Sequence, residues 1–152
     1  MNALPTGTVT FLFSDVEGST QLVRTAGGAY ADVIADVRRL LRAEIAAHGG
    51  AEVDATGDEI SAVFQEVQPA LHAALGGQES IRDHGWPDGI VVKVRMGLHT
   101  GLPHLGEEGY TGLDVIRASR IAASGHGGQV LLSSTAAPVS YTHLTLPTKR
   151  IV

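Results

Sequence analysis

The chain has 152 residues, 43% of them hydrophobic, a formal net charge of −5 and no cysteine. This length suits one domain with a single core, and the missing cysteines exclude a disulfide framework, a thiolate zinc site and a cysteine nucleophile. The acidic balance offers no basic surface to a nucleic-acid backbone. Because no apolar run is long enough to cross a bilayer and the first residues lack the features of a signal peptide, we expect a cytoplasmic location.

The first half of the sequence predicts a strand, a helix and a hairpin. Residues 8–14 form a β-branched and aromatic run, which predicts a buried strand that ends in a polar turn. Residues 29–48 carry apolar side chains at helical spacing. Residues 52–56 and 59–64 predict two short strands, and the intervening Gly-Asp pair supplies a hairpin turn.

The second half predicts two more helices and two more strands. Residues 68–84 predict a helix, and residues 91–99 alternate in polarity as a strand does. Residues 101–109 are rich in glycine and predict an irregular arm. A third helix is expected over 112–124, where Gly112 would permit close packing on the sheet, and a last strand over 129–133.

The order of these elements predicts the fold class. It is β-α-β-β-α-β followed by the arm, a helix and a strand, which matches the ferredoxin-like arrangement of an α/β (α+β) domain. In that arrangement an antiparallel sheet carries helices on one face. The predicted elements lie within residues 1–137. We expect these residues to form one domain that is incomplete at its C-terminus.

Residues 138–152 do not continue the pattern of the domain. Back-translated, residues 138–144 resemble a transposon end sequence that is used as a sequencing adapter. The expectation is that 138–152 form a non-native or disordered tail. The alternative is an ordinary strand and tail at the end of the domain.

Two carboxylates are the strongest candidates for a functional site. Asp15 directly follows the first predicted strand, and Asp58 lies at the tip of the hairpin. A first strand beside such a hairpin would bring both to one edge of the sheet, where oxygen ligands of this kind suit magnesium with substrate phosphates as further ligands. The turn that follows would open a helix whose free amides suit a polyphosphate, and it consists of Val16, Glu17, Gly18, Ser19 and Thr20.

Four segments in order resemble one known family. Residues 10–20 and 56–58 are similar to its two metal-binding segments, and residues 94–101 to the strand that leads into its dimerisation arm. Residues 117–121 and 126–133 resemble its arginine-bearing helix and the strand after it. On these motifs the chain resembles the class III adenylate and guanylate cyclase catalytic domain, and the resemblance covers about positions 7 to 135.

The resemblance implies a reaction and a set of roles. The ribose 3′-hydroxyl of a nucleoside triphosphate attacks the α-phosphorus, which gives a 3′,5′-cyclic nucleotide and pyrophosphate. Asp15 and Asp58 would hold two divalent ions, Mg²⁺ or Mn²⁺, together with the backbone of Val16. Arg120 would bind the phosphoryl oxygens, because a planar guanidinium can donate to two of them. In this family the arginine comes from the other subunit of a homodimer. Further signalling domains in a longer parent protein are also expected.

Three positions depart from the family pattern where it addresses base and ribose. Asp54 stands in place of the purine-reading lysine, Gly109 in place of its polar partner, and Ile116 in place of the ribose-orienting asparagine. As hypotheses, Asp54 would accept a hydrogen bond from a purine amino group, and Asp114 would supply a polar substitute near Ile116. The choice between adenine and guanine stays open.

These departures leave alternatives open. A catalytically weakened cyclase homology domain would bind nucleotide or only dimerise within a larger signalling protein. A different phosphoryl transfer on the same fold is a third option. Glu17 would either complement the dipole of the following helix or add to the site. Arg38, Arg39 and Arg42 are expected to form a solvated helix face. His99 and His104 are expected to have structural or surface roles, because their spacing fits no standard zinc site.

Overall fold

The computed structural model describes residues 4–136 and 149–151. Its elements, in chain order, are β1 (Val9–Val16), α1 (Ser19–Ala26), the 3₁₀ turn η1 (Gly27–Ala29), α2 (Tyr30–Ala47), β2 (Ala51–Thr56), β3 (Glu59–Phe64), α3 (Val67–Asp83), β4 (Val94–Gly101), β5 (His104–Gly106), β6 (Gly109–Thr111), α4 (Leu113–Ala123), β7 (Val130–Leu132) and β8 (Lys149–Ile151). The predicted β-α-β-β-α-β order is confirmed.

A mixed sheet forms the middle layer of the domain. Its strand order is β2-β3-β1-β4-β7-β8. Strand β2 pairs with β3, β3 with β1 and β1 with β4, all antiparallel. Strand β7 runs parallel to β4, and β8 runs parallel to β7. The central position of β1 explains its apolar run, because both of its edges and both of its faces are covered.

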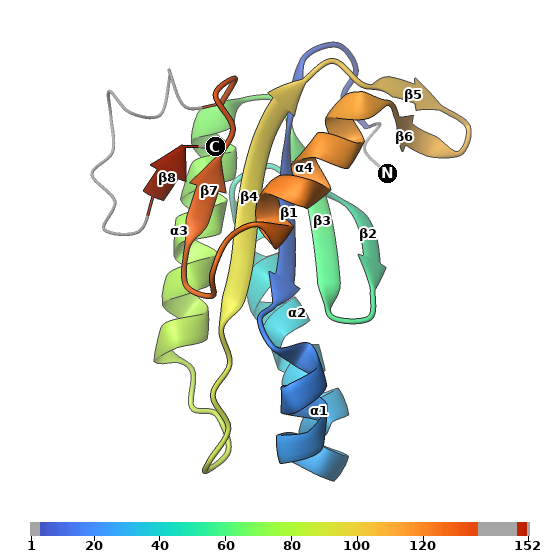
Figure 1. Ribbon diagram of the computed structural model, residues 1–152. Coiled ribbons are helices and arrows are strands. Elements are labelled where there is room, and N and C mark those ends of the chain that lie inside the picture. Colours follow the sequence, from blue (N-terminus) through green and yellow to red (C-terminus); the bar gives the residue numbers. More distant parts are fainter. Residues whose placement is uncertain (1–3, 137–148, 152) are drawn as a thin grey trace.

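Helices cover both faces of the sheet (Figure 1). The helices α2 and α3 of the predicted β-α-β-β-α-β unit lie on one face, as expected, and the larger core forms there. The arginine-bearing helix α4 lies on the opposite face over a smaller cluster that includes Phe11 and Ala118. Successive side chains of β1 point to opposite faces of the sheet. Leu12 and Val16 therefore belong to the larger core, and Phe11 belongs to the smaller cluster.

Close packing of α4 on the sheet depends on Gly97 rather than on Gly112. A Cβ atom at Gly97 would lie 2.5 Å from the backbone nitrogen of Ala122. Gly112 has open space around it and instead adopts a φ of +120° before the first turn of α4. The expectation for Gly112 was therefore wrong, because its role is conformational.

The predicted irregular arm is a small hairpin. Strands β5 and β6 pair antiparallel, and Gly109 begins β6 with a φ of +100°. Tyr110 anchors this hairpin: its ring packs edge-on against Phe11 at a centroid distance of 5.2 Å, and its hydroxyl donates to the Pro5 carbonyl. Backbone pairing and one aromatic anchor thus give order to a segment with few apolar residues.

Strand β4 begins later than predicted. It starts at Val94, which pairs with Val16, the last residue of β1. Residues 91–93 have no strand partner at that end because β1 has already ended. Alternation in polarity alone does not reveal where the neighbouring strand stops.

Most of the predicted tail lies outside the described residues. Within 138–152 the structure describes Lys149–Ile151, whose backbone forms β8 beside β7. The prediction of a non-native or disordered tail therefore stays untested. In the described part of the chain, no helix has the length and apolar character needed to span a membrane.

Candidate metal and phosphate site

The end of β1 places Asp15 opposite an arginine of β4. Asp15 and Arg95 are register partners, and the guanidinium donates to both carboxylate oxygens, from Nε to Oδ1 at 2.7 Å and from Nη2 to Oδ2 at 2.5 Å. The hydrogen bond to Asp15 raises the pKa of Arg95, against the opposing effect of burial. Sequence reasoning missed Arg95, although the alternation of β4 placed it on a polar face.

Asp58 reaches the same edge from the β2–β3 hairpin. Its Oδ2 accepts the backbone N–H of Val16 at 2.9 Å. The side chain thereby contacts the residue that follows Asp15, so the hairpin tip and the end of β1 are brought together as the sequence predicted. The roles of these residues as metal ligands stay predictions.

Helix α2 holds the hairpin in this position. Arg38 donates through Nη2 to the carbonyl of Gly57, the residue before Asp58. One turn later, Arg42 pairs with Glu52 of β2 at 2.5 Å. The expectation of a solvated arginine face was therefore wrong for Arg38, which is half-buried, and fits Arg39 and Arg42, whose side chains are 61% and 48% exposed.

The donor set at this edge suits a hard divalent cation. Asp15, Glu17 and Asp58 all contribute negative charge that raises the pKa of Arg95. In the described residues, no group of three or more His, Cys, Asp or Glu side chains is arranged to hold a metal ion. The ligands that the protein could offer here are the carboxylates of Asp15 and Asp58 and the backbone oxygen of Val16. Magnesium is commonly held by such a partial set, with substrate phosphates as the remaining ligands.

The predicted phosphate turn has an unusual backbone at Gly18. Gly18 caps α1 with a φ of +64°, and no side chain caps the helix, so Ser19 and Thr20 begin it with amides that lack intrahelical acceptors. Glu17 lies before this cap and therefore outside the first helical turn. Its carboxylate is instead 3.9 Å from Nδ1 of His126.

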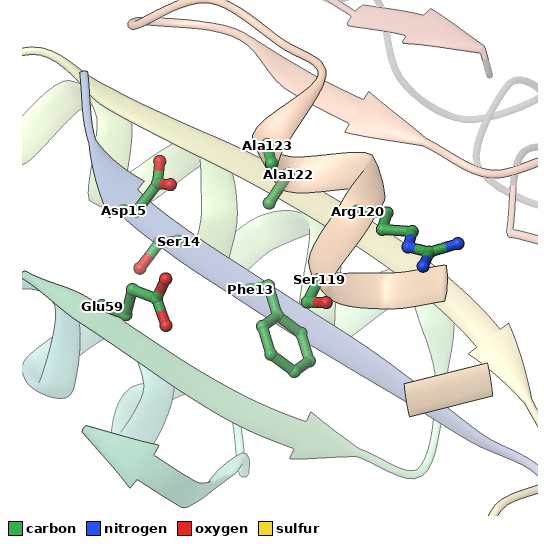
Figure 2. A pocket seen from close by; sticks show the side chains of 8 residues that line it. All are labelled: Phe13, Ser14, Asp15, Glu59, Ser119, Arg120, Ala122 and Ala123. Carbon is green, nitrogen blue, oxygen red and sulfur yellow. The ribbon is translucent and has the colours of Figure 1, made fainter. Parts of the chain in front are cut away.

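Arg120 lies on the same face of the sheet as Asp15 but does not meet it. Both residues line a shallow pocket of about 190 Å³, together with Phe13, Ser14, Glu59, Ser119, Ala122 and Ala123. Figure 2 shows the carboxylates of Asp15 and Glu59 at one end of this pocket, and the Arg120 guanidinium directed away from them. One copy of the chain thus separates its candidate metal ligands from its candidate phosphate-binding arginine.

The positions expected to address base and ribose are spread over three elements. Asp54 is exposed on β2, where its Oδ2 accepts from the Thr56 hydroxyl at 3.3 Å. Gly109 lies in the β5–β6 hairpin. Ile116 is 47% exposed on α4. No hydrogen bond within the described residues joins these three positions to the edge that holds Asp15.

Asp114 is engaged within its own chain. Its Oδ1 lies 2.7 Å from Nε2 of the buried His99, and its Oδ2 accepts the N–H of Leu102 at 2.9 Å. The bond to His99 is the largest cause that lowers the pKa of Asp114, followed by the bond from Leu102. These bonds attach the first turn of α4 to β4, and the prediction that Asp114 addresses ribose stays untested.

Comparisons with known proteins show which family the chain belongs to. The family model of the adenylate and guanylate cyclase catalytic domain matches residues 1–148. An uncharacterised protein of Mycobacterium tuberculosis is 36% identical over 132 residues, which cover 86% of this chain and 44% of that protein. An adenylate cyclase of Podospora anserina is 31% identical over 156 residues and is matched over 7% of its length.

Solved structures show the same fold. A Trypanosoma brucei adenylate cyclase in its monomeric state has a TM-score of 0.80 at 25% identity, over 95% of this chain and 79% of that chain. A Silicibacter pomeroyi adenylate/guanylate cyclase/hydrolase has a TM-score of 0.78 at 26% identity, over 92% and 83%. The chain spans less than half the length of the curated relatives named above. It belongs to the class III adenylate and guanylate cyclase catalytic domain family.

Proposed function

We propose that the chain is the catalytic part of a purine nucleotide cyclase, which converts ATP or GTP into the 3′,5′-cyclic nucleotide and pyrophosphate. One observation carries the proposal: Asp58 accepts the N–H of Val16 at 2.9 Å, beside Asp15. This contact holds Asp58 against the residue that follows Asp15, so two carboxylates from distant parts of the sequence lie at one edge of the sheet. Family membership supplies the reaction class.

Asp15, Asp58 and the backbone of Val16 would hold two Mg²⁺ or Mn²⁺ ions. Bound there, such ions supply positive charge that stabilises the attacking and leaving oxygens at phosphorus. Arg95 occupies both oxygens of Asp15. A cation at this carboxylate therefore competes with the guanidinium for the same lone pairs.

Two elements of the chain, the start of α1 and Arg120 of α4, would bind different parts of the triphosphate. The uncapped start of α1 at Gly18, Ser19 and Thr20 presents backbone amides and the positive end of the helix to phosphate oxygens. Arg120 would place its guanidinium on the phosphoryl group that is transferred, where its fork of donors fits two oxygens. Because the proposed substrates are nucleoside triphosphates, we place this domain in the cytoplasm.

Two copies of the chain would complete the site. The outward direction of Arg120 supports this arrangement, because the residue points away from Asp15 of its own copy (Figure 2). In a homodimer with twofold symmetry, each copy would contribute carboxylates to one site and an arginine to the other. Further domains in the parent protein would control how the two copies meet.

The test is an assay of the full-length protein with ATP and with GTP, in the presence of Mg²⁺ or Mn²⁺. We expect cyclic product from the wild type and none above background from Asp58→Ala. Asp88→Ala removes an exposed carboxylate from the loop before β4 and serves as the matched control. Wild-type protein that yields no product with either nucleotide would contradict the proposal.

A second candidate is a cyclase homology module that binds nucleotide or only dimerises. The exposed Ile116 and the anionic Asp54 favour it, because a hydrocarbon and an anion stand where the family has a ribose-orienting asparagine and a purine-reading lysine. Orientation of the nucleophile contributes several kcal/mol to such reactions. This second candidate would be supported if the full-length protein binds ATP or GTP firmly but forms no cyclic product in the assay above.

A further inference from the structure

A polar network centred on the buried His99 joins β4, α4 and the segment after β7. His99 is 4% exposed and uses both ring nitrogens: Nε2 faces Asp114, and Nδ1 lies 2.8 Å from the Ser133 hydroxyl. Thr135 extends the network, because its Oγ1 lies 2.8 Å from the Ser133 hydroxyl and donates to the Thr100 carbonyl at 2.7 Å. Such hydrogen-bonded networks fix the relative positions of the elements that they join.

The network lies at the first turn of α4, where the Asp114 side chain reaches the sheet. A Cβ atom at Gly101 would lie 2.2 Å from the Asp114 carboxyl carbon, so this glycine leaves the room that the carboxylate occupies. No side chain caps α4. Asp114 therefore attaches the helix to the sheet at the end that lacks a cap. Arg120 follows on the same helix, roughly two turns further on.

The order Asp114–His99–Ser133 also resembles the hydrogen-bonded triad of serine hydrolases. A nucleophile must reach a substrate, however, and Ser133 is only 5% exposed. Its hydroxyl is also shared with Thr135. The contacts therefore favour a role in holding α4 rather than in attacking a substrate.

We propose that His99 is a positioning residue that acts through Asp114 to set the place of α4, and with it Arg120, on the sheet. The inference rests on the proposed function, in which Arg120 of one copy serves the carboxylates of the other. It assigns His99 to the arginine-supplying copy of each site. His99 lines a pocket of about 490 Å³ together with Arg120, but only 4% of its surface is exposed, so the inference assigns it a role in position rather than in chemistry.

Three substitutions separate the two bonds of His99. Glutamine carries an amide nitrogen near the place of Nε2 and can still donate to Asp114. Asparagine places its amide near Nδ1 and can reach only Ser133, and leucine makes neither bond. Thr10→Val is the matched control, because it removes the buried Thr10–Thr100 hydroxyl pair from the same sheet without touching α4.

The experiment uses mixed full-length subunits that each lack half of the site. Asp58→Ala subunits can supply only the arginine, and Arg120→Ala subunits only the carboxylates. We expect His99→Leu in the Asp58→Ala subunit to lower the rate of cyclic product formation by at least about tenfold. The same change in the Arg120→Ala subunit should leave the rate within about twofold. His99→Gln should retain most of the rate, whereas His99→Asn should behave as leucine does.

Equal losses from His99→Leu in either subunit would overturn the inference, because they would indicate a general effect on folding. Glutamine as harmful as leucine would also overturn it. If mixtures without any His99 change yield no product, the proposed function fails instead. Deuterium exchange then decides the inference: His99→Leu must raise exchange in residues 113–123 above that of Thr10→Val, and unchanged exchange overturns it.

Discussion

The two regions expected to handle phosphate are built in opposite ways. At the end of β1, the charged groups face one another: Asp15 is paired with Arg95, and Asp58 accepts from Val16. On α4, the corresponding charged group faces outward, and Arg120 is exposed at the far end of the pocket that Asp15 lines (Figure 2). The contacts of the first region form within one copy of the chain, whereas the second directs its charged group away from the carboxylates of its own copy.

This difference indicates how the two regions respond to mutation. The carboxylate edge is held by contacts between distant segments, such as those of Val16 with Asp58 and of Arg38 with Gly57. Substitution of a residue such as Arg38 should therefore affect the site by moving Asp58. The outward face of α4 has few contacts of its own, so its geometry depends on how the helix sits on β4. Substitutions can therefore disturb either region separately.

The largest effect is expected from removal of the outward arginine. Arg120→Ala should lower the rate of cyclic product formation by about a hundredfold or more, because a donor aimed at developing charge is lost. Arg120→Lys should recover little, since an ammonium lacks the planar fork. Arg39→Ala, on the opposite layer, is the control and should leave the rate unchanged. An active Arg120→Ala enzyme would show that α4 does not serve the site.

Displacement of α4 should come next in size. Gly97→Ala places a Cβ atom 2.5 Å from the Ala122 nitrogen, so the helix must move. We expect a loss of about 1–3 kcal/mol in the free energy of unfolding, measured by urea denaturation. Gly28→Ala meets no atom within 4 Å and is the matched control. Equal stability of the two variants would mean that α4 packs less closely than described.

A smaller effect is expected at the anchor of the hairpin. Arg38→Ala removes the donor to the Gly57 carbonyl, so the turn that carries Asp58 becomes less well held. The affinity for Mn²⁺, measured by calorimetry on the full-length protein, should fall by about tenfold, as for other groups that orient metal ligands. Arg39→Ala is again the control, because it is the neighbouring arginine and pairs with Asp36. Unchanged Mn²⁺ affinity in Arg38→Ala would contradict the anchoring role.

The smallest effect concerns pH. The bonds from His99 and Leu102 hold the pKa of Asp114 below its ordinary value of 3.8. A carboxyl group with a lowered pKa stabilises the fold above its unfolded pKa, and this stability is lost as the pH falls through the folded pKa. The wild type should therefore be more stable than Asp114→Asn at neutral pH, and the difference should shrink below about pH 4. Denaturation series that show a constant difference would contradict this reading.

The sequence was sufficient for the β-α-β-β-α-β elements and for the meeting of the hairpin tip with the end of β1. Asp15 at a strand end and Asp58 at a hairpin tip needed only local patterns, and the antiparallel pairing of β1 with β3 brings them together. Arg95 was harder to find, because its partner follows from the register of β4 on β1. Alternation assigns a face to a residue but does not name the residue opposite.

The remaining features depend on tertiary distances that no local pattern encodes. Gly97 and Gly112 look alike in the sequence, and only the position of α4 shows which one has a backbone against it. Arg38 resembles its neighbour Arg39 until the hairpin is placed beside α2. His99 has no partner nearby in the sequence, because Asp114 and Ser133 come from other elements.

The most direct test of the account mixes two inactive variants of the full-length protein, Asp58→Ala and Arg120→Ala. If each site takes its carboxylates from one copy and its arginine from the other, mixed dimers contain one intact site. The mixture should then form cyclic product at about a quarter of the wild-type rate, although neither variant is active alone. A mixture as inactive as its components, under conditions in which the wild type is active, would contradict the account.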